Sequence, residues 1–201
     1  MPILYHAPMT RSTGAVALVH ELGVDEITIQ DVTIARPNGI GGPDPQNPHP
    51  EKKVPYLVDG DEHLRERAAI FAYLTDKYPD AGLAPLPGQP GRGAYLSWLA
   101  YYQGVIETVL IVKFSGLDAG AIAESVRDVD TMMATLEAAL QKRPWLLGDT
   151  FSAADILCSS PFFWFDGLTE GYPNLTDWVQ RCGARPGMQY ATQRDATAMS
   201  A

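Results

Sequence analysis

The sequence is poor in cysteine and in basic residues, and it contains no long apolar run. Its two cysteines, Cys158 and Cys182, are too far apart for a C-x-x-C or metal-ligand spacing, so free thiols and a reducing cytoplasm are expected. The 15 lysines and arginines are outnumbered by 24 acidic residues, and the net charge of -9 argues against nucleic acid as a partner. No run reaches the roughly 18 apolar residues that a membrane span requires, so no membrane partner is expected.

Internal repeats and blocks of like charge are also missing, which excludes solenoids and long acidic tails. With 201 residues, 46% of them apolar, the chain is long enough for one large domain or two small ones. Glycine and proline, by contrast, are abundant, with 18 and 16 residues. They are concentrated in residues 36–49, which we interpret as a surface loop, and in residues 79–93, where we expect a linker between domains.

The beginning of the sequence has the pattern of a small α/β domain. Residues 3–6 are expected to form a strand, followed by a polar loop and an apolar-periodic helix that ends at Gly23. Residues 26–32 alternate apolar and polar side chains, as a half-buried strand does, and a crossover through the helix would make the two strands parallel. Two further strands flank the hairpin turn Asp59-Gly60, and a helix follows from Glu66 to Tyr78. The predicted order is strand, helix, strand, loop, strand, strand, helix.

The rest of the sequence, from residue 92 to 195, shows only helical periodicity. Apolar residues at 3.6-residue spacing form one stripe from Tyr95 to Leu110 and another from Ile122 to Leu140. Ser152, followed three residues later by Asp155, forms a capping box that predicts a helix start.

The end of the chain is expected to hold two short helices, at residues 175–181 and 187–194, with a frayed tail from residue 195 onward. We therefore predict two domains, residues 1–79 and 92–201. The linker between them covers residues 80–91.

The start of the helix at Glu66 suggests a binding site. A helix N-terminus favours a bound carboxylate, and Glu66 beside it could hold an ammonium group, so together they would suit an α-amino acid. Pro55 in the preceding strand indicates a strand start, a bulge or a cis peptide bond facing a ligand. The alternative is structural: Glu66 only favours the helix start, and Pro55 only begins a strand.

Four segments, taken together, resemble the cytosolic glutathione transferases of bacterial type. Residues 49–55, HPEKKVP, are similar to the family's N-P-x-G-K-V-P, and residues 64–70, LRERAAI, to its L-x-E-S-x-A-I. Residues 148–155 match G-D-x-F-S-x-A-D, and residues 178–191 resemble the closing W-x(n)-R-P-x-x-x-x-A. The resemblance implies a thioredoxin-like N-terminal domain, β-α-β-α-β-β-α, followed by an all-α domain.

The same resemblance implies a glutathione site. Its residues would be Lys53, Val54, Pro55, Glu66 and Arg67. The backbone of Val54, before a cis-Pro55, would pair with the cysteinyl part of glutathione, and Glu66 would help to hold the γ-glutamyl group. Arg67 departs from the pattern, because the family usually has a serine there. Its guanidinium could replace the hydroxyl as a carboxylate ligand but is much bulkier.

The loop after the first strand is where the family places the residue that activates the thiol. Glutathione's thiol has an unperturbed pKa near ~8.5, so a hydroxyl hydrogen bond, a cation or a helix N-terminus would each favour the thiolate. Ser12 is the first candidate and Thr10 the second, with Arg11 as an electrostatic helper. The alternative is that these hydroxyls only cap the helix.

The electrophile pocket is expected between the domains, lined by Met9, Trp98, Tyr101, Tyr102 and Phe163. The predicted function is detoxification: conjugation of the glutathione thiolate to a small electrophile by a cytoplasmic homodimer, with glutathione as co-substrate and no metal. The first alternative is a non-catalytic glutathione transferase-like binding or regulatory protein. The second, a glutathione-dependent disulfide reductase or lyase, would call for a loop cysteine that the sequence lacks.

Overall fold

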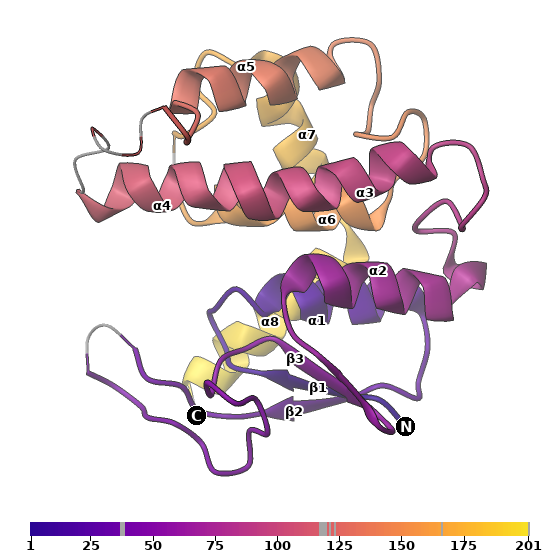
Figure 1. Ribbon diagram of the computed structural model, residues 1–201, viewed down its shortest axis with the longest axis vertical. Coiled ribbons are helices and arrows are strands. Elements are labelled where there is room, and N and C mark those ends of the chain that lie inside the picture. The colour runs from indigo at the N-terminus through magenta and orange to yellow at the C-terminus, as the bar shows by residue number, and fades with distance from the viewer. Residues whose placement is uncertain (37–38, 117–119, 121, 123, 166, 201) are drawn as a thin grey trace. The chain divides into compact units, whose positions relative to one another are not determined.

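The computed structural model describes residues 1–36, 39–116, 120, 122, 124–165 and 167–200. They form two compact units, shown in Figure 1. The first unit combines Met1–Ala81 with the chain from Arg185 onward, and the second is Gly82–Ala184. Within the described residues, none of the helices has both the length and the apolar character that crossing a membrane would need.

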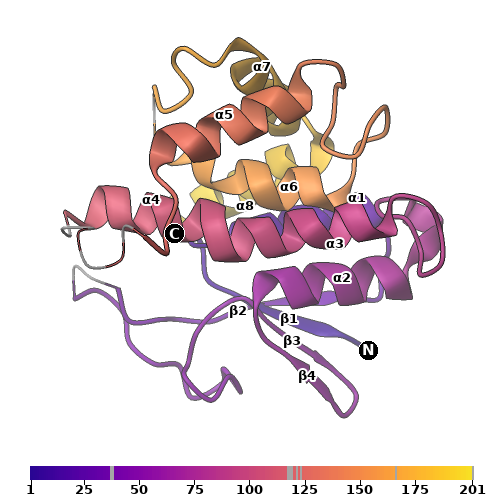
Figure 2. The ribbon, with the colours of Figure 1, turned by 45° about the horizontal axis from the view of Figure 1, so that its top comes forward.

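The first unit contains a four-stranded sheet in the order β2-β1-β3-β4, visible in Figure 2. The strands are β1 (Ile3–His6), β2 (Thr28–Asp31), β3 (Tyr56–Asp59) and β4 (Glu62–Leu64). β1 and β2 are parallel, as the sequence predicted for strands joined through a helix, whereas β3 is antiparallel to both β1 and β4. The hairpin turn at Gly60, with φ of 61°, lies where the Asp-Gly dipeptide predicted it.

Two helices accompany this sheet, α1 (Thr13–Leu22) between β1 and β2, and α2 (Arg67–Lys77) after β4. The family pattern also implied a helix between the second and third strands. Among the described residues between β2 and β3 there is no helix, because prolines and glycines interrupt this stretch repeatedly. The loop predicted from composition is therefore the observed structure.

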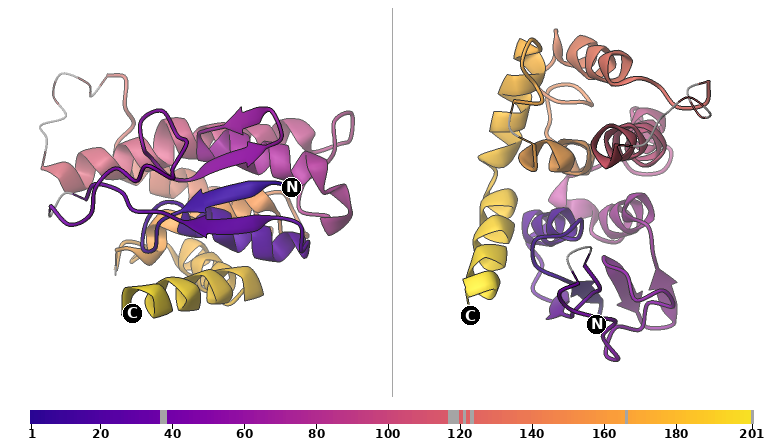
Figure 3. Two further views of the ribbon diagram at one scale, coloured as in Figure 1. Left: turned by 90° about the horizontal axis from the view of Figure 1, so that it is seen from below. Right: turned by 90° about the vertical axis from the view of Figure 1, so that its left-hand side faces the viewer.

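The C-terminal helix α8 (Pro186–Ser200) belongs to the first unit, where it packs along α1 (Figure 3). The predicted boundary, which assigned the whole chain after residue 92 to the helical domain, therefore differs from the observed one. The predicted frayed tail was also wrong, since the helix continues to Ser200 and Asp195 is fully buried. Contacts with β1 and α1, which local sequence cannot reveal, hold this end of the chain.

The second unit is built from helices, as predicted. α3 (Arg92–Tyr101), a π-helical turn η2 (Tyr102–Ile106) and α4 (Glu107–Ser115) follow one another directly, and the predicted stripe runs through all three. The remaining helices are α5 (Val129–Leu140), α6 (Ala153–Ser159) and α7 (Pro173–Gly183), with short 3-10 turns η1 (Pro79–Ala81) in the first unit and η3 (Ser160–Phe163) in the second.

Two helix starts in this unit can be compared with the sequence. α5 begins at Val129 rather than near Ile122, because Asp128 caps it by accepting a hydrogen bond from Thr131 N at 2.6 Å. Residues 117–119, 121 and 123 of the predicted stripe region lie outside the described residues. The capping box at α6 is confirmed: the N–H of Ser152 donates to Asp155 Oδ2 at 2.9 Å.

Candidate active site

The strand register gathers the predicted glutathione-site segments at one end of the sheet. Tyr5 is paired with Tyr56 across the antiparallel β1 and β3, so the end of β1 lies beside the start of β3. Leu57 is paired with Leu64, which places the end of β4 there too. The loop before α1, the residues before β3 and the start of α2 therefore share this end, which can be followed in Figure 2.

The loop from Ala7 to Ser12 joins β1 to α1. Ser12 is the N-cap residue of α1, yet its side chain does not cap the helix and is fully buried. Its hydroxyl lies 2.7 Å from Nδ1 of His6 and 2.8 Å from the hydroxyl of Thr10, and it accepts a hydrogen bond from Ala7 N at 3.2 Å. Thr10 is partly exposed and Arg11 is exposed. Of the two predicted hydroxyls, only that of Thr10 belongs to a residue that reaches the surface.

A carboxylate from the far end of the chain closes this network. Asp195 of α8 lies 2.9 Å from Nε2 of His6, and both side chains are fully buried. Its second oxygen accepts hydrogen bonds from Met9 N at 2.7 Å and from the hydroxyl of Thr13 at 2.6 Å. Burial alone would raise the pKa of Asp195, but hydrogen bonds from His6, Thr13 and Met9 outweigh it and hold the pKa below its usual range.

Sequence reasoning missed both members of this buried pair. His6 was expected only as the last residue of the first strand, and Asp195 fell in the expected tail. A signal was present, because Met188, Ala191 and Asp195 recur on one buried face of α8. A carboxylate on an otherwise apolar helix face predicts a buried hydrogen-bond partner.

The backbone of the loop is fixed on two sides. Met9 has φ of 53°, a left-handed conformation that is unusual for a residue other than glycine, and its side chain is 44% exposed. Besides the contact with Asp195, the guanidinium of Arg36 donates to Pro8 O at 2.6 Å and to Met9 O at 3.4 Å. The loop therefore presents Met9, Thr10 and Arg11 outward from a held backbone.

The segment before β3 is ordered by buried polar side chains that the sequence did not single out. Asn47 is fully buried, and its side-chain amide donates to Lys53 O at 3.0 Å. Lys53 itself is exposed and Val54 is partly buried. The peptide bond between Val54 and Pro55 is cis, as predicted.

At the start of α2, Glu66 is exposed and has φ of 68°, again in the left-handed region. Backbone strain of this kind is concentrated at functional sites. Arg67, the first helical residue, is only 6% exposed. The carboxylate of Glu66 is therefore accessible at the helix N-terminus, whereas the guanidinium of Arg67 is largely withdrawn from solvent.

Comparisons with known proteins identify the family. Residues 119–181 match the family description "Glutathione S-transferase, C-terminal domain". Glutathione S-transferase GstB of Escherichia coli K12 is 30% identical over 156 residues, which cover 70% of this chain and 74% of that protein. A sphingomonad glutathione S-transferase structure complexed with glutathione is 27% identical, with a TM-score of 0.78 over 96% of this chain and 98% of that one. The chain belongs to the glutathione S-transferase family.

Coverage of relatives in this family varies. Glutathione S-transferase F14 of Arabidopsis thaliana is 29% identical over 157 residues, and the match spans 69% of this chain but only 62% of that protein. The likeness to the sphingomonad glutathione S-transferase, in contrast, extends over almost the whole length of both chains. It confirms the predicted fold class, a thioredoxin-like N-terminal part followed by a helical part.

The predicted pocket residues of this glutathione S-transferase have different environments in the helical unit. Trp98 and Tyr101 lie on α3 with their rings edge to face, 5.4 Å apart. The hydroxyl of Tyr101 is shielded and has no hydrogen-bond partner within the part of the chain that the structure describes. Phe163 is 39% exposed, whereas Tyr102 is 1% exposed and belongs to the buried core.

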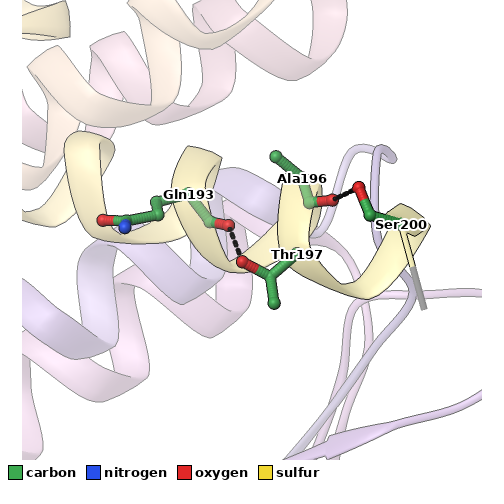
Figure 4. Close-up of a pocket in the computed structure, with 4 residues that line it drawn as sticks. All are labelled: Gln193, Ala196, Thr197 and Ser200. Atoms are coloured by element: carbon green, nitrogen blue, oxygen red, sulfur yellow. Dashed lines mark hydrogen bonds between the residues drawn. The ribbon is translucent and has the colours of Figure 1, made fainter.

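Two surface hollows are lined by residues other than the predicted site residues. One, of about 510 Å³, follows α8 and is lined by Gln193, Ala196, Thr197 and Ser200 (Figure 4). Its two hydroxyls already donate to carbonyl groups of the same helix, each at 2.9 Å. The other, of about 760 Å³, is lined by α4, α5 and residues 124–128. Neither hollow includes a predicted site residue, and among the described residues no group of three or more His, Cys, Asp and Glu side chains could hold a metal.

Proposed function

We propose that this chain conjugates the thiolate of glutathione to small electrophilic molecules. The observation that carries the proposal is the convergence of three segments at one end of the sheet: the loop with Thr10, the cis Val54–Pro55 bond and the start of α2 at Glu66. A sphingomonad relative of the same fold is complexed with glutathione, which supports the same co-substrate here.

In this proposal glutathione lies along that end of the sheet. The backbone of Val54 pairs with the cysteinyl part, and Lys53 is exposed beside it. The γ-glutamyl group lies at the N-terminus of α2, where helix N–H groups favour its carboxylate and the accessible Glu66 holds its ammonium. Arg67, at the first helical position, contributes positive charge to the carboxylate.

For the activating residue, exposure favours Thr10 over Ser12. The thiol must be reached by a group at the surface, and Ser12 is fully buried whereas Thr10 is partly exposed. Thr10 therefore donates the hydrogen bond to the thiolate, and Ser12 orients Thr10 through their 2.8 Å contact. Arg11, exposed next to it, adds a favourable potential for the anion.

The electrophile is held by aromatic side chains of the helical unit, Trp98, Tyr101 and Phe163. The shielded hydroxyl of Tyr101 supports this, because a ligand would supply the partner it lacks among the described residues. Tyr102 supports this wall from the core rather than lining it. The proposal includes a homodimer that works in the cytoplasm in detoxification, and light scattering of the purified protein tests the dimer.

The activity test uses conjugation of glutathione to an aryl halide, an epoxide and a hydroperoxide. Thr10→Val should lower kcat/KM at neutral pH by at least tenfold, while Thr10→Ser should retain most of the rate. Thr28→Val is a matched control, because Thr28 starts β2 at the opposite end of the sheet. Equal rates for Thr10→Val and the control would remove Thr10 from the mechanism.

A second function, glutathione transferase-like binding or regulation without catalysis, is favoured by Arg67. A bulky, largely buried guanidinium stands where a small hydroxyl is typical of the family pattern. Titration calorimetry with glutathione separates the two functions. No binding at millimolar concentration, with binding recovered in Arg67→Ser, would show that Arg67 closes the site and would favour the second function.

A further inference from the structure

The first unit contains a chain of four hydrogen-bonded side chains that runs inward from the predicted thiol position. Thr10, at the surface, lies 2.8 Å from Ser12, and Ser12 lies 2.7 Å from Nδ1 of His6. The other ring nitrogen of His6 lies 2.9 Å from Asp195. Only Thr10 is partly exposed, and the three inner residues are fully buried. Neither binding of glutathione nor a single hydroxyl donor requires a buried imidazole and carboxylate behind the loop.

We propose that these four side chains form a proton relay that takes the thiol proton of bound glutathione and stores it on His6. The inference rests on the proposed function, because it needs a thiol next to Thr10. It assigns His6, Ser12 and Asp195 as positioning and proton-holding residues that never touch the electrophile.

The hydrogens of the chain can be counted before the step. With a neutral imidazole, Nε2–H of His6 donates to Asp195, and Nδ1 accepts the hydroxyl hydrogen of Ser12. The hydroxyl of Thr10 lies 2.8 Å from both Ala7 O and Ser12 Oγ. When it donates to Ser12 rather than to Ala7 O, every contact in the chain contains one hydrogen. An oxygen lone pair of Thr10 remains as the acceptor for the thiol.

The step moves each hydrogen by one place. The S–H bond breaks and its proton goes to Thr10 Oγ1, the proton of Thr10 goes to Ser12 Oγ, and the proton of Ser12 goes to His6 Nδ1. The products are a thiolate that accepts a hydrogen bond from Thr10 and an imidazolium paired with Asp195. When an epoxide is opened, the proton returns along the chain to the alkoxide. When a halide leaves, the proton is released to solvent instead.

The surroundings of His6 suit an imidazolium there. The charged and titratable groups on the elements around it include Asp195, Arg194 and Tyr190 on α8, His20 and Glu21 on α1, Asp31 on β2, Tyr56 on β3 and Arg36 after β2. Arg194 is already neutralised by Asp31, through two hydrogen bonds of 2.7 and 2.9 Å. Arg36 is bound to loop carbonyls. On α1, Thr13 donates its hydroxyl hydrogen to Asp195, Glu21 is paired with Arg185, and His20 lies against the ring of Tyr190. The lowered pKa of Asp195, whose hydrogen bonds outweigh the effect of burial, keeps a negative charge beside the ring.

The gain in rate that the relay can give is limited by the fraction of the thiol that is already ionised without it. With an unperturbed pKa of about 8.5, roughly 3% of the thiol is ionised at pH 7, so full ionisation gains at most about 30-fold in rate. Loss of the relay should therefore lower kcat/KM by up to about 30-fold at pH 7. The loss should disappear near pH 9, where the thiol ionises without help.

The direct test counts protons on the unmodified protein. Glutathione is titrated by calorimetry in two buffers of different ionisation enthalpy, and thiolate formation is followed in parallel by its ultraviolet absorbance. The relay predicts that thiolate forms with much less than one proton released per thiolate, because His6 keeps it. Release of one proton per thiolate would overturn the relay and leave the proposed function intact. Absence of binding or of thiolate would overturn both.

Variants provide the second arm. His6→Gln and Ser12→Ala should each release one proton per thiolate that still forms, and should show the pH-dependent loss of kcat/KM. Thr28→Val is the control, because Thr28 starts β2 at the opposite end of the sheet and lies outside the chain of four. It should keep the proton count of the unmodified protein. A loss in His6→Gln that is the same at pH 7 and pH 9 would mean that His6 is only structural and would refute the relay.

Discussion

Replacement of Gly187 by alanine tests how α8 is attached to the first unit. Gly187 is the second residue of α8, and a Cβ added there would lie 2.5 Å from Cγ of Glu21 and closer still to the carbonyl oxygen of Ala17. Both contacts fall inside 3.0 Å, a distance that real Cβ atoms essentially never go below. Glu21 cannot easily move aside, because it accepts a hydrogen bond from Gly187 N at 2.8 Å and forms an ion pair with Arg185.

Two effects of opposite sign determine the result. Alanine has a better helix propensity than glycine, by about 1 kcal/mol in a helix interior. Against this, overpacking costs about 1–3 kcal/mol, and moving the helix start outward weakens the charge-assisted hydrogen bond from Gly187 N, which is worth about 1.5–3 kcal/mol. We therefore expect a net destabilisation of roughly 1–3 kcal/mol.

Urea unfolding measures this change, with Gly93→Ala as the matched control. Gly93 is near the start of α3, has no positive φ, and a Cβ there would meet nothing within 4 Å. The control should be neutral or more stable by up to about 1 kcal/mol. If Gly187→Ala is as stable as Gly93→Ala, the close approach of α8 to α1 is refuted. Since α8 carries Asp195, we also expect Gly187→Ala, but not the control, to lose conjugation activity.

Two further predictions concern buried carboxylates. Asp155→Ala should lower the free energy of unfolding by about 3 kcal/mol or more, because it leaves buried donors such as Trp178 Nε1, now 2.9 Å from the carboxylate, without a partner. The exposed Asp149→Ala should change it by less than about 0.5 kcal/mol, and an equal effect in urea unfolding would contradict the role of the capping box. Asp195→Asn tests the lowered pKa of Asp195. The hydrogen bonds to this carboxylate stabilise the fold above pH 3.8, its ordinary value, and the contribution is lost as pH falls through the lowered pKa. The difference in free energy of unfolding between the parent and Asp195→Asn should therefore become smaller in acid. A difference that stays constant down to pH 2 would contradict the lowered pKa of Asp195.

The parts of the fold that could be predicted from sequence depend on neighbours in the chain. The Asp59-Gly60 turn requires only a residue that tolerates positive φ between two strand-forming runs. The capping box at Ser152 and Asp155 is likewise contained in four residues. Pro55 carried its own signal, since only proline makes a cis bond common. Such local patterns located the turn, the helix start and the proline, whereas the glutathione-binding role of these segments was implied only by the family resemblance.

The interior of the site could not be predicted in this way. Asp195 and His6 are 189 residues apart, so no window of sequence contains both. The buried state of Ser12 depends on the same contact, and sequence therefore ranked Ser12 above Thr10 when exposure favours the reverse. The helix that carries Asp195 was expected to end before it, because its packing against α1 is a tertiary effect that propensity does not record.

Met9 illustrates why the loop conformation is determined from outside the loop. Its left-handed backbone is unfavourable by about 1–3 kcal/mol. The hydrogen bond from its N–H to the carboxylate of Asp195 is worth about 1.5–3 kcal/mol, so the two terms nearly cancel. The hydrogen bonds from Arg36 to the carbonyl groups of Pro8 and Met9 then supply the additional stabilisation that favours this loop conformation. Since these two partners lie 186 and 27 residues from Met9, the loop's own sequence is compatible with other conformations, and the position of Thr10 depends on a helix at the other end of the chain.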